Sequence, residues 1–553
     1  MEPVVIRNAR FVPRHRSASA ATLLVTLPVA SALVLAGCTV PTAEGTDGST
    51  GENFQVREPS GPALVLDSTD PAELALTASQ AFFHASPVAV LAPADDADDR
   101  ATAAAAGAAV AAPVLLTDGG VSDANIVAEL ERLGVETVVA VGDEEAAAEV
   151  GPATGEADVV RFDPDALSAA AEAAAGGRAD DADEKDEKDA DEKGADDTIP
   201  LPTADRLDEV DVDKLRAQLP EPQDPELLQE ILVAVDPRPG HEAAIGTALA
   251  AGAVPVEVPG GELATSPRTV ETLRTLKPLG VVGIGSGFGT ADDLGWQVEV
   301  AMSGQTLPGG VLRLFPGRYV STTYVTPTSS WDRAAHAAVA VDEAAAAAAA
   351  FEATPVVTVV ASVRSGSAGE DGDFVAEQPL ENVTAAVDAI REAGQLALLD
   401  VAPGNQPLAA QLDDLEPLLT RPGVGLSVHP EFRLAGEGAE AGSVPVAELQ
   451  EVVDRLARLA TEHGLPQVML EVHQSTAASV VDRARLDVPP QVAVVFTAAG
   501  PAEGQATAAG VWADVAGDLP AHTYPGWSAP SHLPADATPL LPAEPPVGLV
   551  SAG

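Results

Sequence analysis

Short runs of β-branched residues alternate with alanine-rich segments along most of this 553-residue chain. Such alternation is typical of α/β folds, in which helices connect parallel strands and cover the sheet. Two stretches share one order of strand, helix, proline-started strand, helix and glycine-ended strand. Matching landmarks, such as Pro113 and Pro255 or Val138 and Val281, are 142 or 143 residues apart. We therefore predict a duplicated parallel α/β module over residues 62–300.

The two repeats predict elements at equivalent places. The first repeat predicts strands at residues 88–91, 113–116 and 138–142 and a helix at 123–133. The second predicts strands at residues 231–235, 255–258 and 281–285 and helices at 242–251 and 269–276. Between the repeats, about residues 176–200, a dense run of like charges has no apolar periodicity, which predicts a disordered acidic linker. A calcium loop is the alternative, but the glycine and closing glutamate of an EF-hand are missing.

This order of elements resembles the cell wall-binding repeat 2 family, whose units have this size. The resemblance covers both repeats and is one of pattern more than of individual side chains. It implies an association with anionic polymers of a Gram-positive cell wall.

A second region begins near residue 310. It predicts strands at residues 319–325, 355–363, 395–401, 424–429, 467–473 and 491–497. It predicts helices at residues 331–351, 380–393 and 446–463. Repeated alternation over some 240 residues predicts a TIM-like (β/α) barrel over residues 310–553, either complete or short of eight strands.

Polar side chains interrupt the expected strands of this barrel. Glu471 and His473 share one face of their strand, while His429 and Glu431 share a face at the end of another. Asp400 ends a third strand, and Asp373 lies in the loop after the strand expected at 355–363. Barrel enzymes place their active sites at the carboxyl ends of the strands, so we predict a polar pocket there.

Several pieces of this region resemble an uncharacterised C-terminal domain of Gram-positive surface lipoproteins. The resembling pieces are Gly372-Asp373-Phe374, Leu399-Asp400, Pro430-Glu431-Phe432-Arg433, His473-Gln474 and Pro525-Gly526-Trp527. The resemblance extends from about residue 310 to the C-terminus, and the family supplies no established reaction. The candidate binding residues of the pocket are Asp373, Asp400, His429, His473, Gln474 and Trp527. The family pattern has Asp before Pro-Glu and an aromatic residue after His-Gln, where this chain has His429 and Ser475.

Two functions remain open for the pocket. In the first, Glu431 and Glu471 are a catalytic acid/base pair that hydrolyses envelope glycans, with Asp400, Asp373 and His473 as neighbours. In the second, the cluster only binds a ligand or stabilises the barrel, and Trp527 or Phe432 provides a stacking platform. A metal-dependent hydrolase that uses His429, His473, Asp400 and Glu431 ranks lower because no H-x-x-x-H or H-E-x-x-H spacing occurs. The sequence therefore predicts neither a metal nor a cofactor.

The N-terminus has the pattern of a signal peptide. Four arginines and His15 precede a short apolar run that ends in Leu35-Ala36-Gly37-Cys38. This ending resembles the bacterial lipobox, which implies cleavage before Cys38 and lipid on its thiol. Cys38 is the only cysteine, so no intrachain disulfide competes for it. We expect a signal peptide at residues 1–37, a flexible tether at 38–61, and anchorage on the outer face of the cytoplasmic membrane, facing the cell wall.

The charge of the chain limits its partners. Its formal net charge is −54, and residues 1–37 carry +3 of that sum, which leaves −57 for the remainder. Such a surface repels nucleic acid, so we expect none as a partner. The expected partners are the membrane, through the lipid anchor, and a cell-wall polymer.

Overall fold

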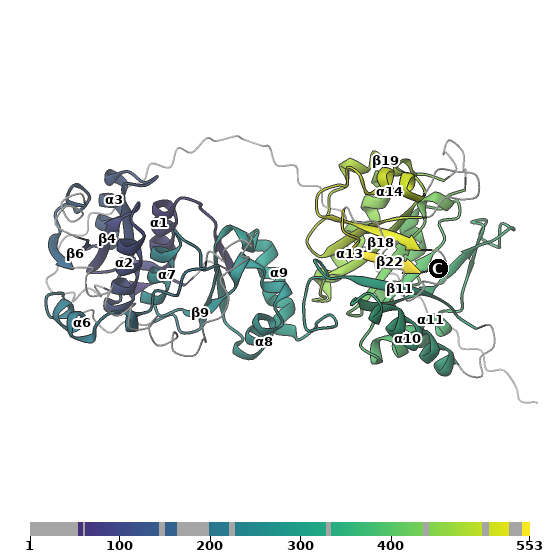
Figure 1. The fold of residues 1–553 in the computed structure, drawn as a ribbon, viewed down its shortest axis with the longest axis horizontal. Coiled ribbons are helices and arrows are strands. Elements are labelled where there is room, and N and C mark those ends of the chain that lie inside the picture. Colours follow the sequence, from purple (N-terminus) through teal and green to yellow (C-terminus); the bar gives the residue numbers. More distant parts are fainter. Residues whose placement is uncertain are drawn as a thin grey trace, which may run out of the picture. The chain divides into compact units, whose positions relative to one another are not determined.

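The computed structural model describes residues 54–58, 61–142, 150–162, 198–220, 227–327, 333–434, 442–499, 508–529 and 545–552. Cys38, the signal peptide, most of the tether and nearly all of the acidic linker lie outside these residues. The described chain forms an α/β part with two parallel sheets and an eight-stranded parallel barrel (Figure 1). The fold class is therefore the predicted one. Among the described helices, none has the length and apolar character needed to cross a membrane.

The first repeat forms a four-stranded parallel sheet in the order β5-β4-β6-β7. Its strands are β4 (Val88–Pro93), β5 (Val114–Thr117), β6 (Thr137–Val141) and β7 (Asp158–Phe162). Its helices are α2 (Ala97–Val110) and α3 (Asp123–Leu133). The strands β4, β5 and β6 are buried on both faces, as expected when helices cover a parallel sheet.

The second repeat forms an equivalent sheet in the order β2-β10-β8-β9. Its strands are β2 (Ala63–Leu66), β8 (Ile231–Val235), β9 (Val254–Glu257) and β10 (Gly280–Ile284). Its helices are α7 (Glu242–Ala250), α8 (Pro267–Leu276) and α9 (Ala291–Ser303). The fourth place, which β7 fills in the first sheet, is taken here by β2 from the start of the module. The two repeats are therefore interlocked rather than strung one after the other.

Equivalent helices of the two repeats, α2 and α7, pack against each other (Figure 1). Arg100 on α2 forms a buried ion pair with Glu242 on α7, 3.2 Å between Nε and Oε2, and the two residues are 142 positions apart. Gly246 meets Ala104 at the same offset, and a Cβ added to Gly246 would lie 2.6 Å from the Ala104 backbone. Residues related by the duplication thus face each other across this contact, and a small residue is needed there.

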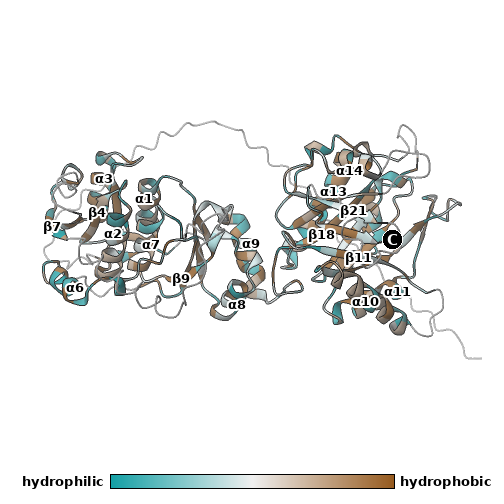
Figure 2. Cartoon of the chain, in the orientation of Figure 1, coloured by the Kyte–Doolittle hydropathy of each residue, from teal (hydrophilic) through white to brown (hydrophobic). Residues whose placement is uncertain are grey.

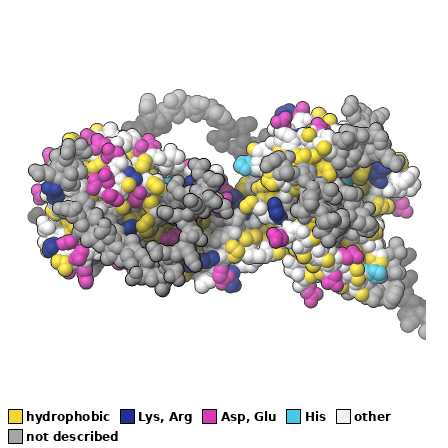
Figure 3. Space-filling model, in the orientation of Figure 1, with side chains coloured by type: hydrophobic (Ala, Val, Ile, Leu, Met, Phe, Trp, Pro, Cys, Tyr) yellow, Lys and Arg dark blue, Asp and Glu magenta, His cyan; other side chains and the backbone are white. Residues whose placement is uncertain are grey.

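Further elements belong to the α/β part. They are β1 (Gln55–Val56), paired antiparallel with β3 (Phe83–Ala85), and the helices α1 (Pro71–Phe82) and α6 (Glu209–Arg216). Asp70 caps α1 by accepting hydrogen bonds from the backbone N–H groups of Ala72 and Glu73. Asp and Glu side chains are spread over the visible face of the molecule, with Lys and Arg sparser among them (Figure 3).

The barrel closes with eight parallel strands in chain order. They are β11 (Tyr319–Val325), β12 (Thr354–Val360), β15 (Leu396–Val401), β16 (Val424–Val428), β18 (Val468–Gln474), β20 (Val492–Ala498), β21 (Thr523–Ala529) and β22 (Leu549–Ala552). Its helices are α10 (Arg333–Ala349), α11 (Leu380–Glu392), α12 (Glu416–Leu419), α13 (Val446–Glu462) and α14 (Ala508–Ala516). Two small sheets, β13 (Ser362–Arg364) with β14 (Val375–Glu377) and β17 (Val444–Pro445) with β19 (Val480–Val481), extend from it.

Successive side chains of each strand point alternately into and out of the barrel, and this alternation determines which residues fill its interior. On β18, Val468, Leu470 and Val472 face outward into the core between strands and helices. Hydrophobic colour accordingly runs along this strand (Figure 2). Met469 faces inward, into an apolar cluster that includes Leu398 and Val495. The interior is thus a packed core at the amino ends of the strands.

Candidate functional site

The interior of the barrel changes from apolar to polar toward the carboxyl ends of the strands. Asp400, Ser427 and Glu471 are paired with one another in the register of β15, β16 and β18, so they lie at one level. On the neighbouring strands β11 and β12, Ser321 and Thr358 are hydrogen-bonded through their hydroxyls. Polar groups buried on the inner face of a barrel need partners, and most of these partners come from within the cluster.

His429 is held between two carboxylates. Strand β16 ends at Val428, and Pro430 starts the 3-10 turn η8 (Pro430–Phe432), which folds Glu431 back toward His429. His429 Nε2 lies 2.6 Å from Asp400 Oδ1, and its Nδ1 lies 3.1 Å from Glu431 Oε1. The Glu431 side chain is only 4% exposed. The pairing therefore sits in a largely dry environment, where charge interactions are strong.

A second histidine–carboxylate pair comes from β18. Glu471 and His473 point to the same side because they alternate along the strand, and His473 Nε2 lies 3.2 Å from Glu471 Oε1. Thr497 on β20 donates its hydroxyl hydrogen to the same Oε1 at 2.9 Å. Glu471 and Thr497 are both fully buried. The Glu471 carboxylate is thus fixed from two sides.

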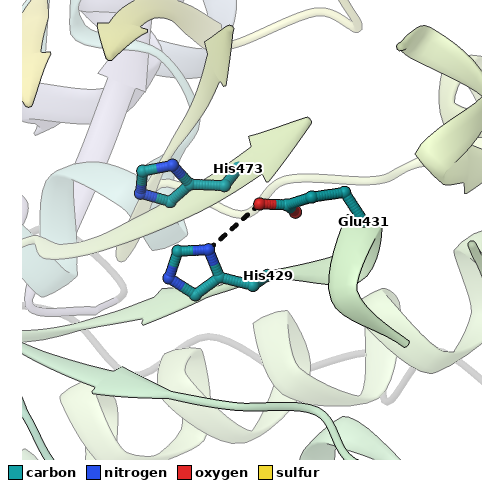
Figure 4. A group of neighbouring side chains, drawn as sticks. All are labelled: His429, Glu431 and His473. Atoms are coloured by element: carbon teal, nitrogen blue, oxygen red, sulfur yellow. Dashed lines mark hydrogen bonds and ion pairs between the residues drawn. The ribbon is translucent and has the colours of Figure 1, made fainter. Parts of the chain in front are cut away.

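The two pairs meet through their imidazole rings. The rings of His429 and His473 are stacked, with centroids 4.3 Å apart and planes at 20° (Figure 4). Phe432 stacks on His429 at 5.2 Å, and the Arg364 guanidinium lies 5.6 Å from the centre of the Phe432 ring. Phe432 and Arg364 are exposed. A series of stacked groups therefore runs from the protein surface to the buried His473.

Charge within the cluster shifts two pKa values. Burial has the largest effect on His429 and would lower its pKa, but attraction and hydrogen bonds from Asp400 and Glu431 outweigh it and raise the pKa well above the usual value. Burial would likewise raise the pKa of Glu471, yet the charge and hydrogen bond of His473, with smaller contributions from Thr497 and His429, lower it. An imidazolium at His429 and a carboxylate at Glu471 are the forms that this network favours.

Each glutamate has one oxygen that is not engaged. Glu431 Oε2 and Glu471 Oε2 are buried, and neither forms a hydrogen bond to any residue that the structure describes. Ser427 Oγ, at the level of Glu471, is in the same situation within the described chain. Buried polar atoms are nearly always hydrogen-bonded, so each exception requires an explanation, such as a bound ligand or ion. Both exceptions among the cluster's carboxylates fall on the two glutamates that the sequence singled out.

The structure thus brings together Asp400, His429, Glu431, Glu471 and His473, the five residues that we call the mouth cluster. Three other predicted site residues lie apart from it: Asp373, Gln474 and Trp527. Asp373 is in the loop between β13 and β14, where its carboxylate accepts a hydrogen bond from the Val375 N–H at 2.8 Å. It belongs to a separate group of three carboxylates with Asp371 and Glu377.

Gln474 and Trp527 face the outside of the barrel. Gln474 follows His473 by one position, so its side chain points away from the interior and binds Arg483 Nη1 at 2.8 Å. Trp527 is buried in the outer core, in edge-to-face contact with Trp512 at 5.8 Å. The structure gives both side chains a packing or bracing position, and Trp527 does not offer a stacking surface at the mouth.

Sequence reasoning missed Thr497 and Arg364 as parts of this site, whereas strand parity already places Ser427 on one face with His429 and Glu431. Thr497 could have been found from strand parity, since it lies on the inward face of the predicted strand beside the one that carries Glu471. Arg364 could not, because its place over Phe432 depends on the path of the β13–β14 hairpin.

Comparison with known proteins gives little direct guidance. No protein-family model matches the chain. No curated protein matches it either. A distant structural neighbour is Cwp6 from Clostridium difficile, with 15% identity and a TM-score of 0.29. That alignment covers 62% of this chain and 63% of Cwp6, just under two thirds of the neighbour's length.

Proposed function

We propose that this protein is an exported lipoprotein of the cell envelope whose barrel binds a hydroxyl-rich envelope glycan at the mouth cluster. Cys38 would hold the chain at the outer face of the membrane, and the α/β repeats would associate with the wall. The support for this location is the lipobox-like sequence before Cys38 and the resemblance of the duplicated module to wall-binding repeats.

One observation carries the proposal for the barrel. Two buried glutamates, Glu431 and Glu471, each have one oxygen held by a histidine and one oxygen without a partner in the described chain. A sugar hydroxyl is a suitable donor for such an oxygen, since charge-assisted O–H hydrogen bonds to carboxylates are strong. His429 and Arg364 already lie over the Phe432 ring, so the proposal rests on hydrogen bonds to the glutamates and not on stacking.

The test is binding of purified wall glycan fragments to the full-length mature chain, followed by calorimetry. We expect Glu431→Gln and Glu471→Gln each to weaken binding by at least about tenfold, because each removes a charged acceptor. Glu462→Gln is the matched control, since that glutamate lies on the surface of α13 with its side chain 58% exposed. Equal binding by all three variants would contradict a glycan site at the mouth cluster.

Hydrolysis of a glycosidic bond is a second candidate function, and the ionised state of Glu471 favours it. A carboxylate with a lowered pKa fits the nucleophile or base, which leaves Glu431 as the acid. The expected result is release of new reducing ends from wall glycan by the wild-type chain, with a loss of at least about 100-fold in Glu471→Gln. Binding of glycan without any release would leave the mouth cluster as a binding site and remove this candidate.

Association with the wall through the α/β repeats needs its own test because the chain is strongly acidic. We expect the full-length mature chain to sediment with purified cell walls, and added Ca²⁺ or Mg²⁺ to increase the bound fraction by bridging like charges. A chain that stays in the supernatant with and without these ions would contradict wall association.

A further inference from the structure

We propose that the mouth cluster is a site for a divalent metal ion, with His429, Glu431 and His473 as ligands. The inference deepens the proposed function, since it uses the same cluster, and it names Zn²⁺ as the probe. The sequence ranked a metal site here lower because it has no helical metal-binding spacing, whereas these ligands come from the turn after β16 and from β18.

The ligand atoms already lie near the separations that a metal requires. One nitrogen from each histidine and one oxygen of Glu431 all lie within 4.8 Å of one another, and His429 Nδ1 is 3.1 Å from Glu431 Oε1. Around a tetrahedral zinc ion with bonds of about 2.0–2.2 Å, ligand atoms are roughly 3.3–3.6 Å apart. Shifts of about an ångström in side-chain position therefore suffice to form the site.

The surroundings of both histidines match those of metal ligands. A ligating histidine binds the ion with one ring nitrogen and donates the N–H of the other to a carboxylate. His429 Nε2 is held by Asp400, and His473 Nε2 is held by Glu471. His429 Nδ1 faces Glu431 Oε1 at 3.1 Å, and an ion there would replace the proton between these two ligand atoms. Thr497 in turn orients Glu471. Both outer-shell carboxylates are thus present and on the correct nitrogen.

Charge and hydrogen bonding also favour a cation. The mouth cluster places three carboxylates around two imidazoles in an interior where Glu471 is fully buried. Glu431 Oε2 has no hydrogen-bond partner among the described residues, and a divalent ion would engage it. Carboxylate oxygen and imidazole nitrogen together suit Zn²⁺ and its neighbours in the first transition row better than Mg²⁺ or Ca²⁺, which prefer oxygen alone.

Metal binding would have a visible structural consequence. The imidazole rings are stacked with planes at 20°, so their in-plane lone pairs lie in two nearly parallel planes and do not converge (Figure 4). For both to reach one ion, at least one ring must turn out of the stack. Three protein ligands would leave one position for water or a substrate oxygen, which is the arrangement of hydrolytic rather than structural zinc sites.

The test uses the full-length mature chain after removal of metals with a chelator. Zinc added in excess and then dialysed should remain at one ion per chain in the wild type. It should be lost from His429→Ala and from His473→Ala. His463→Ala is the matched control, because His463 is exposed at the end of α13, and it should retain the ion. Asp400→Asn should weaken zinc binding about 10- to 100-fold without abolishing it, as expected for an outer-shell group.

A spectroscopic readout guards against variants that only misfold. Cobalt substituted for zinc should give the visible absorption of a four-coordinate site in the wild type, and Glu431→Gln, a change of one atom, should alter it. The metal site would be overturned if the wild type fails to retain zinc. It would also be overturned if His429→Ala and His473→Ala retain as much zinc as the wild type. Glycan binding that persists in the chelator-treated protein would then leave the proposed function standing without it.

Discussion

At the scale of single residues, Thr497 determines how Glu471 is presented to the mouth cluster. Both side chains are fully buried, and the Thr497 hydroxyl donates to Glu471 Oε1 at 2.9 Å. We expect Thr497→Val to lower the free energy of unfolding of the barrel by about 1–3 kcal/mol, because a buried carboxylate loses a donor while the packing volume is kept. Urea unfolding followed by tryptophan fluorescence measures this, since Trp512 and Trp527 lie in the outer core of the barrel.

Thr461→Val provides the comparison for this prediction. Thr461 is an exposed residue of α13 whose hydroxyl bonds only to the backbone of the preceding turn. Its replacement should change the free energy of unfolding by no more than about 0.5 kcal/mol. Similar effects of the two substitutions would mean that the Glu471 hydrogen bond has no special importance.

Much of the mouth cluster could be predicted from residue identity and strand parity. Glu471 and His473 had to share a face because they alternate on one strand, and Asp400 had to lie near them because carboxyl ends of parallel strands meet. The stack of His429 on His473 could not be foreseen, since ring orientation depends on the turn at Pro430. Gln474 and Trp527 were grouped with the site by sequence proximity to His473 and by aromatic character. Both side chains point outward, so strand parity predicts the members of the site better than sequence proximity or aromatic character does.

At the scale of elements, the contact between α2 and α7 depends on a glycine. A methyl group at Gly246 would lie 2.6 Å from the Ala104 backbone, which cannot move aside as a flexible side chain could. We expect Gly246→Ala to destabilise this helix pair by about 1–3 kcal/mol through overpacking, despite the better helix propensity of alanine. Hydrogen exchange measured by mass spectrometry should show faster exchange of the α7 amides.

Gly295→Ala is the matched substitution in α9. There the added methyl would meet only the Ala63 side chain, at 3.6 Å, which is ordinary contact. The helix should be stabilised by about 0.5–1 kcal/mol, and exchange of its amides should slow. Slower exchange in both variants would show that the α2–α7 contact tolerates a wider separation.

The elements differ in how well the sequence indicated them. Helix α3 and strand β8 have the predicted bounds because their hydrophobic patterns are clear and their ends are marked by turn residues. The last two barrel strands were missed: β21 contains Pro525 and Gly526, which argue against a strand, and β22 has only four residues. Strand β2 was missed for a different reason. A four-residue apolar run can be identified as a strand only from its pairing, and the partner strand β10 lies far along the chain.

At the scale of the whole molecule, the proposed lipid anchor predicts that location depends on Cys38. The residue itself lies outside the described structure. We expect Cys38→Ser to abolish incorporation of a labelled fatty acid and to release the chain from the membrane fraction into the medium. Retention of the variant in the membrane fraction would require another anchor. Export itself should continue, because the apolar run before Cys38 is unchanged.

The place of β2 in the second sheet has a consequence for the folding of the protein during its synthesis. Val65 pairs with Gly283, so the first strand of the module must wait for a partner about 220 residues away. At about 5–20 residues per second, the ribosome supplies that partner on the order of 10–40 s later. During this interval an apolar strand remains unpaired, and the second repeat cannot close as its own chain segment emerges. The module therefore matures late and as a whole, and its earliest strand is the one that most needs protection from premature pairing.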